Sequence, residues 1–274
     1  MATPTSLSTF LELRSRYLLT CYVKAEEGLH VGSGTPVGES DSPFIQENGE
    51  AFLPGSTLRG AMRSTLERLS RALFPPGSPR RPCMLFVRDE DNEGADCACA
   101  VEKTRKKYEA DTGAMETALR KGELRLCPVC QLFGSTLMAA RLKVGDARFS
   151  AGAKEPVIRD GVGIDRDTET AKEKIKYNFE VLDPGPEFRF EIQVENAEES
   201  DFALLHILLQ EMKRGMEVGG KKSRGLGKIV LTKYEVKYFD GARGHGLGEF
   251  LAGGYGNETT TAFERRLVDA FQQS

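Results

Sequence analysis

The sequence contains no long apolar run and no recognisable leader segment. None of its apolar stretches approaches the roughly 20 residues that a membrane-spanning helix needs. Its first residues, Met1 to Phe10, lack the charged start and long apolar centre of a secretory signal peptide. A composition of 39% hydrophobic and 29% charged residues is ordinary for a soluble globular protein. We therefore expect a cytoplasmic protein with one large domain or two small ones.

The chain also lacks an overall excess of positive charge. Its formal net charge is −3, which argues against a general nucleic-acid binder. The charges are placed unevenly, however, because residues 57–81 hold six arginines and one glutamate, and residues 213–237 hold eight cations and two glutamates. A basic track on a mildly acidic body is expected of a specific nucleic-acid groove, although solvated helix faces would produce similar clusters.

Cysteines are few, but five of the six lie close together in the sequence. In a reducing cytosol such clustering indicates a metal site rather than disulfides. The spacing of Cys127-Pro-Val-Cys130 lets two thiolates reach one tetrahedral Zn²⁺, and an all-thiolate site would be structural because it leaves no position open for water. A buried set of free thiols is the alternative. Five candidates compete for four positions, and the sequence does not choose between Cys97 and Cys99; the candidates are Cys83, Cys97, Cys99, Cys127 and Cys130.

A glycine-rich segment at residues 219–228 contains four glycines and four cations. Backbone N–H groups in such a turn form a concavity that binds anions, and lysine and arginine add charge for phosphate. The alternative is a flexible turn with solvated lysines. The candidate RNA contacts in this segment are Gly220, Lys222, Ser223, Arg224 and Gly225.

A second candidate phosphate site begins at Pro54-Gly55, where a helix is predicted to run to about Phe74. The N-terminus of this helix, at Ser56 and Thr57, offers N–H donors to phosphate. Arg59 and Arg63 follow four residues apart and could clamp successive phosphates. A capped amphipathic helix with solvent-exposed arginines is the alternative.

Acid–base chemistry is predicted in the loop that follows the first strand. Asp41 could orient a 2′-hydroxyl or hold a divalent cation such as Mg²⁺ during phosphodiester cleavage. His30, at the start of the same loop, could assist as an acid–base group. A turn aspartate and a hydrogen-bonded structural histidine are the alternatives. We expect no function for His206 or His245.

The predicted elements have the order strand, helix, strands, then strand, helix, strand. This order is that of an α+β, ferredoxin-like, RNA-recognition-type βαββαβ core within residues 1–240. We expect two additions to this core: a cysteine-bearing insertion at about 75–130 with the zinc site, and a protruding hairpin at about 158–180. Residues 241–274 are expected to form a glycine-rich linker and a C-terminal helix.

Six motifs in one order resemble the RAMP superfamily of CRISPR-associated proteins, specifically the backbone subunit of type III effector complexes. They span about residues 17–236, which is most of the chain. The motifs are Gly28-Leu29-His30-Val31-Gly32, Asp41-Ser42-Pro43-Phe44-Ile45, Pro54-Gly55-Ser56-Thr57-Leu58-Arg59-Gly60 with Arg63, Cys127-Pro-Val-Cys130-Gln-Leu-Phe133-Gly134, Val162-Gly163-Ile164-Asp165-Arg166 with Thr168, and Gly219-Gly220 with Ser223-Arg224-Gly225-Leu226-Gly227.

The resemblance implies copies stacked along a guide RNA, whose backbone is held by Arg59, Arg63 and the glycine-rich segment. It implies that the hairpin is a thumb that displaces a base pair of the guide–target duplex at regular intervals, and that Asp41 cuts the target RNA beside each displaced base. The implied partners are guide RNA, target RNA, further copies of the chain and other CRISPR effector subunits. A non-catalytic filament subunit and a stand-alone guide-RNA-processing ribonuclease are the alternatives. The insertion and the C-terminal tail are not explained by the resemblance.

Overall fold

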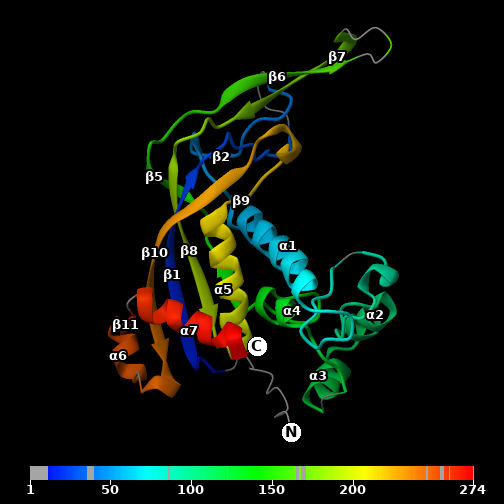
Figure 1. The fold of residues 1–274 in the computed structure, drawn as a ribbon, viewed down its shortest axis with the longest axis vertical. Helices are drawn as coiled ribbons and strands as arrows, with labels where there is room; N and C mark the ends of the chain where they lie inside the picture. Colours follow the sequence, from blue (N-terminus) through cyan, green and yellow to red (C-terminus); the bar gives the residue numbers. More distant parts are fainter. Residues whose placement is uncertain are drawn as a thin grey trace.

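The computed structural model describes residues 12–35, 40–85, 87–121, 123–164, 167, 171–244, 246–253, 256–258 and 260–273. Its centre is an antiparallel sheet with the strand order β11-β10-β1-β8-β4, to which β5 adds beside β8 and β9 beside β10 (Figure 1). The strands are β1 (Ser15–Ala25), β4 (Leu142–Val144), β5 (Arg148–Ala151), β8 (Glu187–Glu195), β9 (Met216–Glu217), β10 (Lys228–Asp240) and β11 (Gly256–Glu258).

The central strands form because their apolar residues alternate with polar ones. In β1 every second side chain is buried, and β8 shows the same alternation. Since successive side chains of a strand point to opposite faces, one face of the sheet becomes apolar. Leu19 of β1 lies in register with Ile192 on one side and Val236 on the other, and all three are buried.

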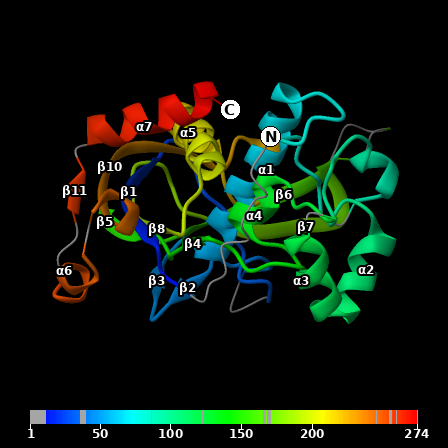
Figure 2. The ribbon, with the colours of Figure 1, turned by 90° about the horizontal axis from the view of Figure 1, so that it is seen from below.

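Three helices with amphipathic sequences pack around this sheet: α1 (Gly55–Leu73), α5 (Glu199–Arg214) and α7 (Thr260–Gln273). Helices α5 and α7 pack on each other and on β10, and Figure 2 shows both on the same side of the sheet. The buried residues of α5 include Phe202, Leu205, Leu208 and Leu209, which have helical spacing. Glu198 and Asp201 begin α5 with a reciprocal capping box. The α+β class predicted from the sequence is therefore confirmed.

A long hairpin extends from one end of the sheet (Figure 1). Its strands β6 (Val157–Ile164) and β7 (Ala171–Val181) form a two-stranded sheet of their own. Residues 165, 166 and 168 of the predicted thumb motif lie outside the described residues. A smaller predicted hairpin is also present, with β2 (Gln46–Glu47) and β3 (Glu50–Ala51) joined by Asn48 and Gly49 in the left-handed conformation.

The insertion at about 75–130 contains two α-helices before its last residues. These are α2 (Glu102–Ala110) and α3 (Thr112–Arg120), preceded by the short helix η1 (Asp89–Asn92). Asp111 separates them, because its side chain accepts a hydrogen bond from the Ala114 N–H at 2.9 Å and so caps α3. The insertion leads into α4 (Pro128–Phe133), which lies beside α1 (Figure 1).

The segment expected to be a glycine-rich linker carries regular structure of its own. It holds η3 (Gly241–Arg243), α6 (Leu247–Leu251) and β11, which pairs with β10. Helix α7 then returns to the core, where Phe263, Leu267 and Ala270 are buried. His245 lies outside the described residues. Among the helices that the structure describes, none has the length and apolar character needed to cross a membrane.

Candidate functional site

Four cysteine sulfurs of the insertion gather at one place, all within 4.8 Å of one another. The Sγ atom of Cys83 lies 3.5 Å from that of Cys97, 3.4 Å from that of Cys130 and 3.8 Å from that of Cys127. Four thiolates around Zn²⁺ at Zn–S distances of about 2.3 Å would be separated by about 3.8 Å. The number, type and spacing of the donors therefore fit one tetrahedral metal ion.

The structure separates the two candidates between which the sequence did not choose. Cys97 belongs to the four-sulfur group, whereas Cys99 is buried nearby but outside it. Cys127 and Cys130 lie at the start of α4, where Pro128 occupies the first turn. The backbone N–H of Cys127 points to Cys97 Sγ at 3.2 Å.

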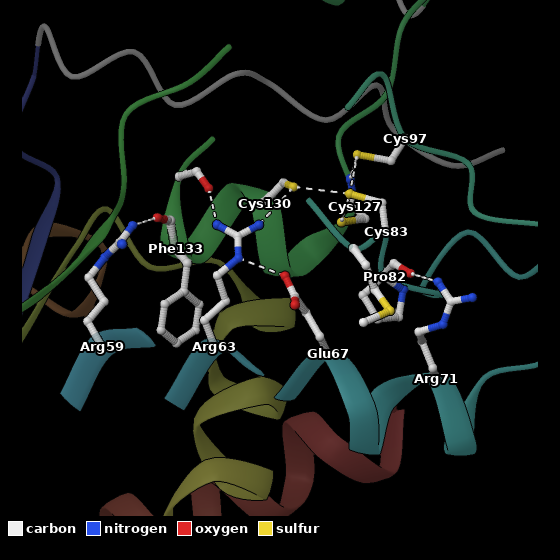
Figure 3. A network of polar contacts seen from close by, with 12 residues as sticks. Arg59, Arg63, Glu67, Arg71, Pro82, Cys83, Cys97, Cys127, Cys130 and Phe133 are labelled. Carbon is white, nitrogen blue, oxygen red and sulfur yellow. Dashed lines mark hydrogen bonds and ion pairs between the residues drawn. The ribbon is translucent and has the colours of Figure 1, made fainter. Parts of the chain in front are cut away.

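Arg63 and Arg59 turn from α1 toward α4 (Figure 3). The Arg63 guanidinium donates to Gly134 O at 2.6 Å, to Cys130 Sγ at 3.4 Å and to the Glu67 carboxylate at 2.7 Å. Arg59 donates to Phe133 O. These contacts bind α1 to the helix that carries two of the clustered cysteines. The predicted role of both arginines in holding RNA stays a prediction.

The start of α1 is shaped by contacts outside its own first turn. The backbone N–H of Gly55 donates to Asp146 Oδ1 at 2.7 Å, so this aspartate supplies the cap. A Cβ atom on Gly55 would collide with the Val144 carbonyl, so glycine is required there. Ser56 is exposed and Thr57 half-buried, which leaves their predicted contact with phosphate sterically open.

Asp41 lies at the surface, against the base of the β6–β7 hairpin. Its backbone N–H donates to Asn178 Oδ1 at 2.6 Å, and the backbone N–H of Asn178 donates to Asp41 Oδ2 at 2.8 Å. These two hydrogen bonds hold the Asp41 carboxylate in place. Because Asp41 is exposed, its carboxylate is still open to solvent.

His30 lies against the same strand, β7, but it is only 5% exposed. Its Nδ1 atom lies 2.7 Å from Glu180 O, and its Nε2 atom lies 3.3 Å from Ser42 Oγ. A carbonyl oxygen only accepts, so Nδ1 carries the proton and Nε2 accepts from the serine hydroxyl. Burial lowers the pKa of His30 and favours this neutral form. These contacts hold His30 between strand β7 and the loop that carries Ser42. Its predicted acid–base role stays a prediction.

The glycine-rich segment meets His30 from the other side. The backbone N–H of Gly220 donates to His30 O at 2.8 Å. Gly219 has a φ of 78°, and a Cβ atom there would collide with the same carbonyl, so glycine permits the close approach. The next residues form the short helix η2 (Lys222–Arg224). The exposed residues of this segment include Gly220, Lys222, Ser223, Arg224 and Gly225.

Cations of the glycine-rich segment also cover aromatic rings of β7. Lys221 Nζ lies 4.3 Å from the Phe179 ring centroid, and the Arg224 guanidinium lies 5.4 Å from that of Tyr177. Arg224 also donates to the Tyr177 hydroxyl. Sequence reasoning missed Asn178, Glu180 and Tyr177, because no local motif surrounds them and their partners lie far away in the chain.

Comparison with known proteins identifies the family of this chain. The sequence model of the RAMP superfamily matches residues 22–230, well over half of the chain. A relative from Methanothermobacter thermautotrophicus, named CRISPR system Cms endoribonuclease Csm3, is 23% identical over 88% of this chain and 96% of its own length. A protein of the same name from Methanocaldococcus jannaschii is 25% identical over 84% of this chain and 86% of its own length. The chain therefore belongs to the RAMP superfamily.

Proposed function

We propose that this chain is a guide-RNA-binding backbone subunit of a type III CRISPR effector complex, and that it cleaves complementary target RNA. Two relatives named as CRISPR endoribonucleases support the proposal over most of the chain. The fold supports it as well: along the chain the core runs β1-α1-β4-β8-α5-β10, and in space the antiparallel order is β10-β1-β8-β4. This order is the one expected of a ferredoxin-like core such as RNA-recognition domains use, and it supports our assignment of that core.

The guide-RNA backbone would lie along the glycine-rich segment. Its residues from Lys222 to Gly225 are exposed, and Lys222 and Arg224 supply two cations there. Ser56, Thr57, Arg59 and Arg63 would extend the contact along α1. The β6–β7 hairpin would act as the thumb that displaces a base pair, while base pairing with the guide reads the target sequence.

The observation that carries the catalytic proposal is the exposed Asp41 carboxylate, held against strand β7 of the hairpin by Asn178. In the proposed reaction the ribose 2′-hydroxyl of the target gives its proton to water and attacks the adjacent phosphorus, and the departing 5′ oxygen takes a proton from water. The bond to the 5′ oxygen of the next nucleotide breaks, which leaves a 2′,3′-cyclic phosphate and a 5′-hydroxyl. Asp41 would orient the attacking hydroxyl and hold a divalent cation such as Mg²⁺, which supplies positive charge beside the phosphate.

We further propose that Cys83, Cys97, Cys127 and Cys130 hold a structural Zn²⁺. All four are buried, and a site closed by four thiolates leaves no position for water or substrate. The ion would fix the insertion and the start of α4 in place without taking part in cleavage.

The test is the Asp41→Ala variant in the assembled, guide-loaded complex. We expect the single-turnover rate of target-RNA cleavage to fall by about 10²- to 10⁴-fold, the usual range for loss of a positioned acid–base group. Target binding should stay within about twofold because base pairing provides it. A target with a 2′-deoxyribose at the cut position should resist the unmodified complex.

Two results would favour other assignments. Cleavage at the unaltered rate by Asp41→Ala, with target binding intact, would indicate a non-catalytic filament subunit. Cleavage of precursor guide RNA by the isolated chain would indicate a processing ribonuclease.

A further inference from the structure

The segment that carries Asp41 is fastened to strand β7 at several points. Asn178 accepts from the backbone N–H of Asp41 at 2.6 Å and donates its own backbone N–H to the Asp41 carboxylate at 2.8 Å. Two residues further along, the Glu180 backbone N–H donates to Ser42 O at 3.0 Å, and the Glu180 carboxylate accepts from the Phe44 N–H at 2.8 Å. The Glu180 carbonyl accepts from His30.

Strand β7 makes these contacts with backbone groups at its edge and with side chains on one face. Asn178 and Glu180 are two residues apart, so their side chains share one face of β7, the face toward the Asp41 segment. Tyr177 and Phe179 share the other face, where Lys221 and Arg224 of the glycine-rich segment lie over their rings. Strand β7 is therefore held on one face by the segment that carries Asp41 and on the other by the proposed guide-RNA contact.

We propose that Asn178 and Glu180 are positioning residues that tie Asp41 to the β6–β7 hairpin. Through them, the place where the hairpin enters the guide–target duplex determines which phosphate Asp41 reaches. The inference rests on the proposed function, since it assumes that Asp41 is required for cleavage. It adds the residues that hold Asp41 and a physical reason for cuts at a constant distance from the hairpin.

Asn178 is expected to matter because cleavage depends steeply on geometry. A displacement of about 1 Å can lower a reaction rate by about 100-fold. Asn178→Ala removes the side-chain acceptor and keeps the backbone N–H, so Asp41 would remain attached at only one of its two points. Glu180→Gln keeps an oxygen that can accept from Phe44, whereas Glu180→Ala removes it.

The experiment uses guide-loaded complexes assembled with each variant and target RNA labelled at one end. The single-turnover cleavage rate at saturating target, the target dissociation constant and the position of each cut are measured. We expect Asn178→Ala and Glu180→Ala to lower the rate about 10-fold or more, with target affinity within about twofold and a larger fraction of cuts at neighbouring phosphates. Glu180→Gln should cleave within about threefold of the unaltered rate.

Asp183→Ala is the matched control, because it breaks an exposed contact of the same hairpin. Arg159 donates to Asp183 at 2.7 Å, and both side chains are more than 40% exposed. This variant should cleave at the unaltered rate and at the unaltered positions.

Three results would overturn the inference while Asp41 remains essential. These are an unaltered rate in Asn178→Ala, equal losses in Glu180→Gln and Glu180→Ala, and a loss of target affinity that accounts for the loss of rate. Unaltered cleavage by Asp41→Ala would instead overturn the proposed function and this inference together.

Discussion

The cysteine cluster differs from the Asp41 junction, where Asp41 meets Asn178 of strand β7, in what surrounds their chemical groups. In the cluster, four buried sulfurs face one another, and Arg63 contacts them from α1. At the junction, Asp41 is exposed, and protein contacts hold it mainly through the neighbouring backbone and Asn178. The first arrangement is closed to substrate, and the second leaves a carboxylate open to a ligand.

Because of this difference, we expect substitutions in the two regions to change different properties, stability in one and cleavage in the other. Changes at the buried cluster remove contacts that hold α1, α4 and the insertion together, so they should lower stability. Changes at the exposed junction remove few buried contacts, so they should alter cleavage and leave most of the stability intact. Each prediction below tests one side of this comparison.

The largest effect on stability is expected from loss of the proposed metal. Cys130→Ser should bind well under one equivalent of zinc and should unfold at a markedly lower temperature, because structural Zn²⁺ contributes apparent binding energies of about 10–16 kcal/mol in small zinc domains. The measurements are metal content by mass spectrometry and thermal unfolding with and without a chelator.

Cys99→Ser is the matched control for this prediction, since Cys99 is buried beside the cluster but lies outside the four-sulfur group. It should keep a full equivalent of zinc. A chelator that leaves both metal content and unfolding temperature unchanged would contradict the assignment of a structural metal.

A smaller loss is expected from Arg63→Ala in the guide-free protein. The substitution leaves Glu67, which is 8% exposed, without its partner and removes a donor from Gly134 O. Removing one partner of a buried ion pair costs about 3–5 kcal/mol, and we expect about 2–4 kcal/mol here because Arg63 is 13% exposed. Urea unfolding measures this free energy.

Arg68→Ala is the control on the same helix, since Arg68 is exposed. It should change the free energy of unfolding by less than about 0.5 kcal/mol. If Arg63→Ala were equally mild in the absence of RNA, the contact with α4 would contribute nothing, and RNA binding would be the sole role left for Arg63.

The smallest effect concerns pH and lies at the junction. Burial lowers the pKa of His30 below the ordinary histidine value, and the nearby Lys221 lowers it further while Glu180 opposes the shift. As the pH falls through about 6.5, His30 takes up a proton more readily in the unfolded chain than in the folded chain, so the free energy of unfolding should decrease. Each unit of pKa difference corresponds to about 1.4 kcal/mol.

The check compares the unaltered protein with His30→Gln by urea unfolding between pH 7.5 and 5, a range chosen around about 6.5, the ordinary histidine pKa. The stability of His30→Gln should depend less on pH. Burial also lowers the pKa of His206, whereas burial raises the pKa of Asp201 to about 6, so only the difference between the two proteins is assigned to His30. Identical pH profiles would show that His30 does not titrate differently on folding.

Local patterns account for the parts of the molecule that sequence alone could predict. Residues 188–194 alternate between apolar and polar side chains, which predicts a strand where β8 lies, and Leu58, Met62 and Leu66 have the helical spacing that predicts the buried face of α1. The Cys127–Cys130 spacing indicated a metal site at the place where the four sulfurs gather. In each case, the residues that make the pattern lie within a few positions of one another.

Contacts between distant segments escaped prediction for the opposite reason. Asp41 and Asn178 are 137 positions apart, and Arg63 and Cys130 are 67 apart. A single sequence contains no periodicity that connects such pairs. The segment at 241–256 was likewise expected to be a linker, and the pairing of β11 with β10 escaped prediction because it depends on where the sheet edge lies.

The sequence by itself determined the α+β class, the candidate residues and the order of motifs that placed the chain near a known superfamily, because these depend on local chemistry and spacing. Only the tertiary structure decided that Cys97 rather than Cys99 joins the sulfur group, that Arg63 contacts a cysteine, and that Asn178 holds Asp41. Those outcomes depend on how sheet, hairpin and insertion pack, and packing brings together atoms whose separation along the chain carries no signal.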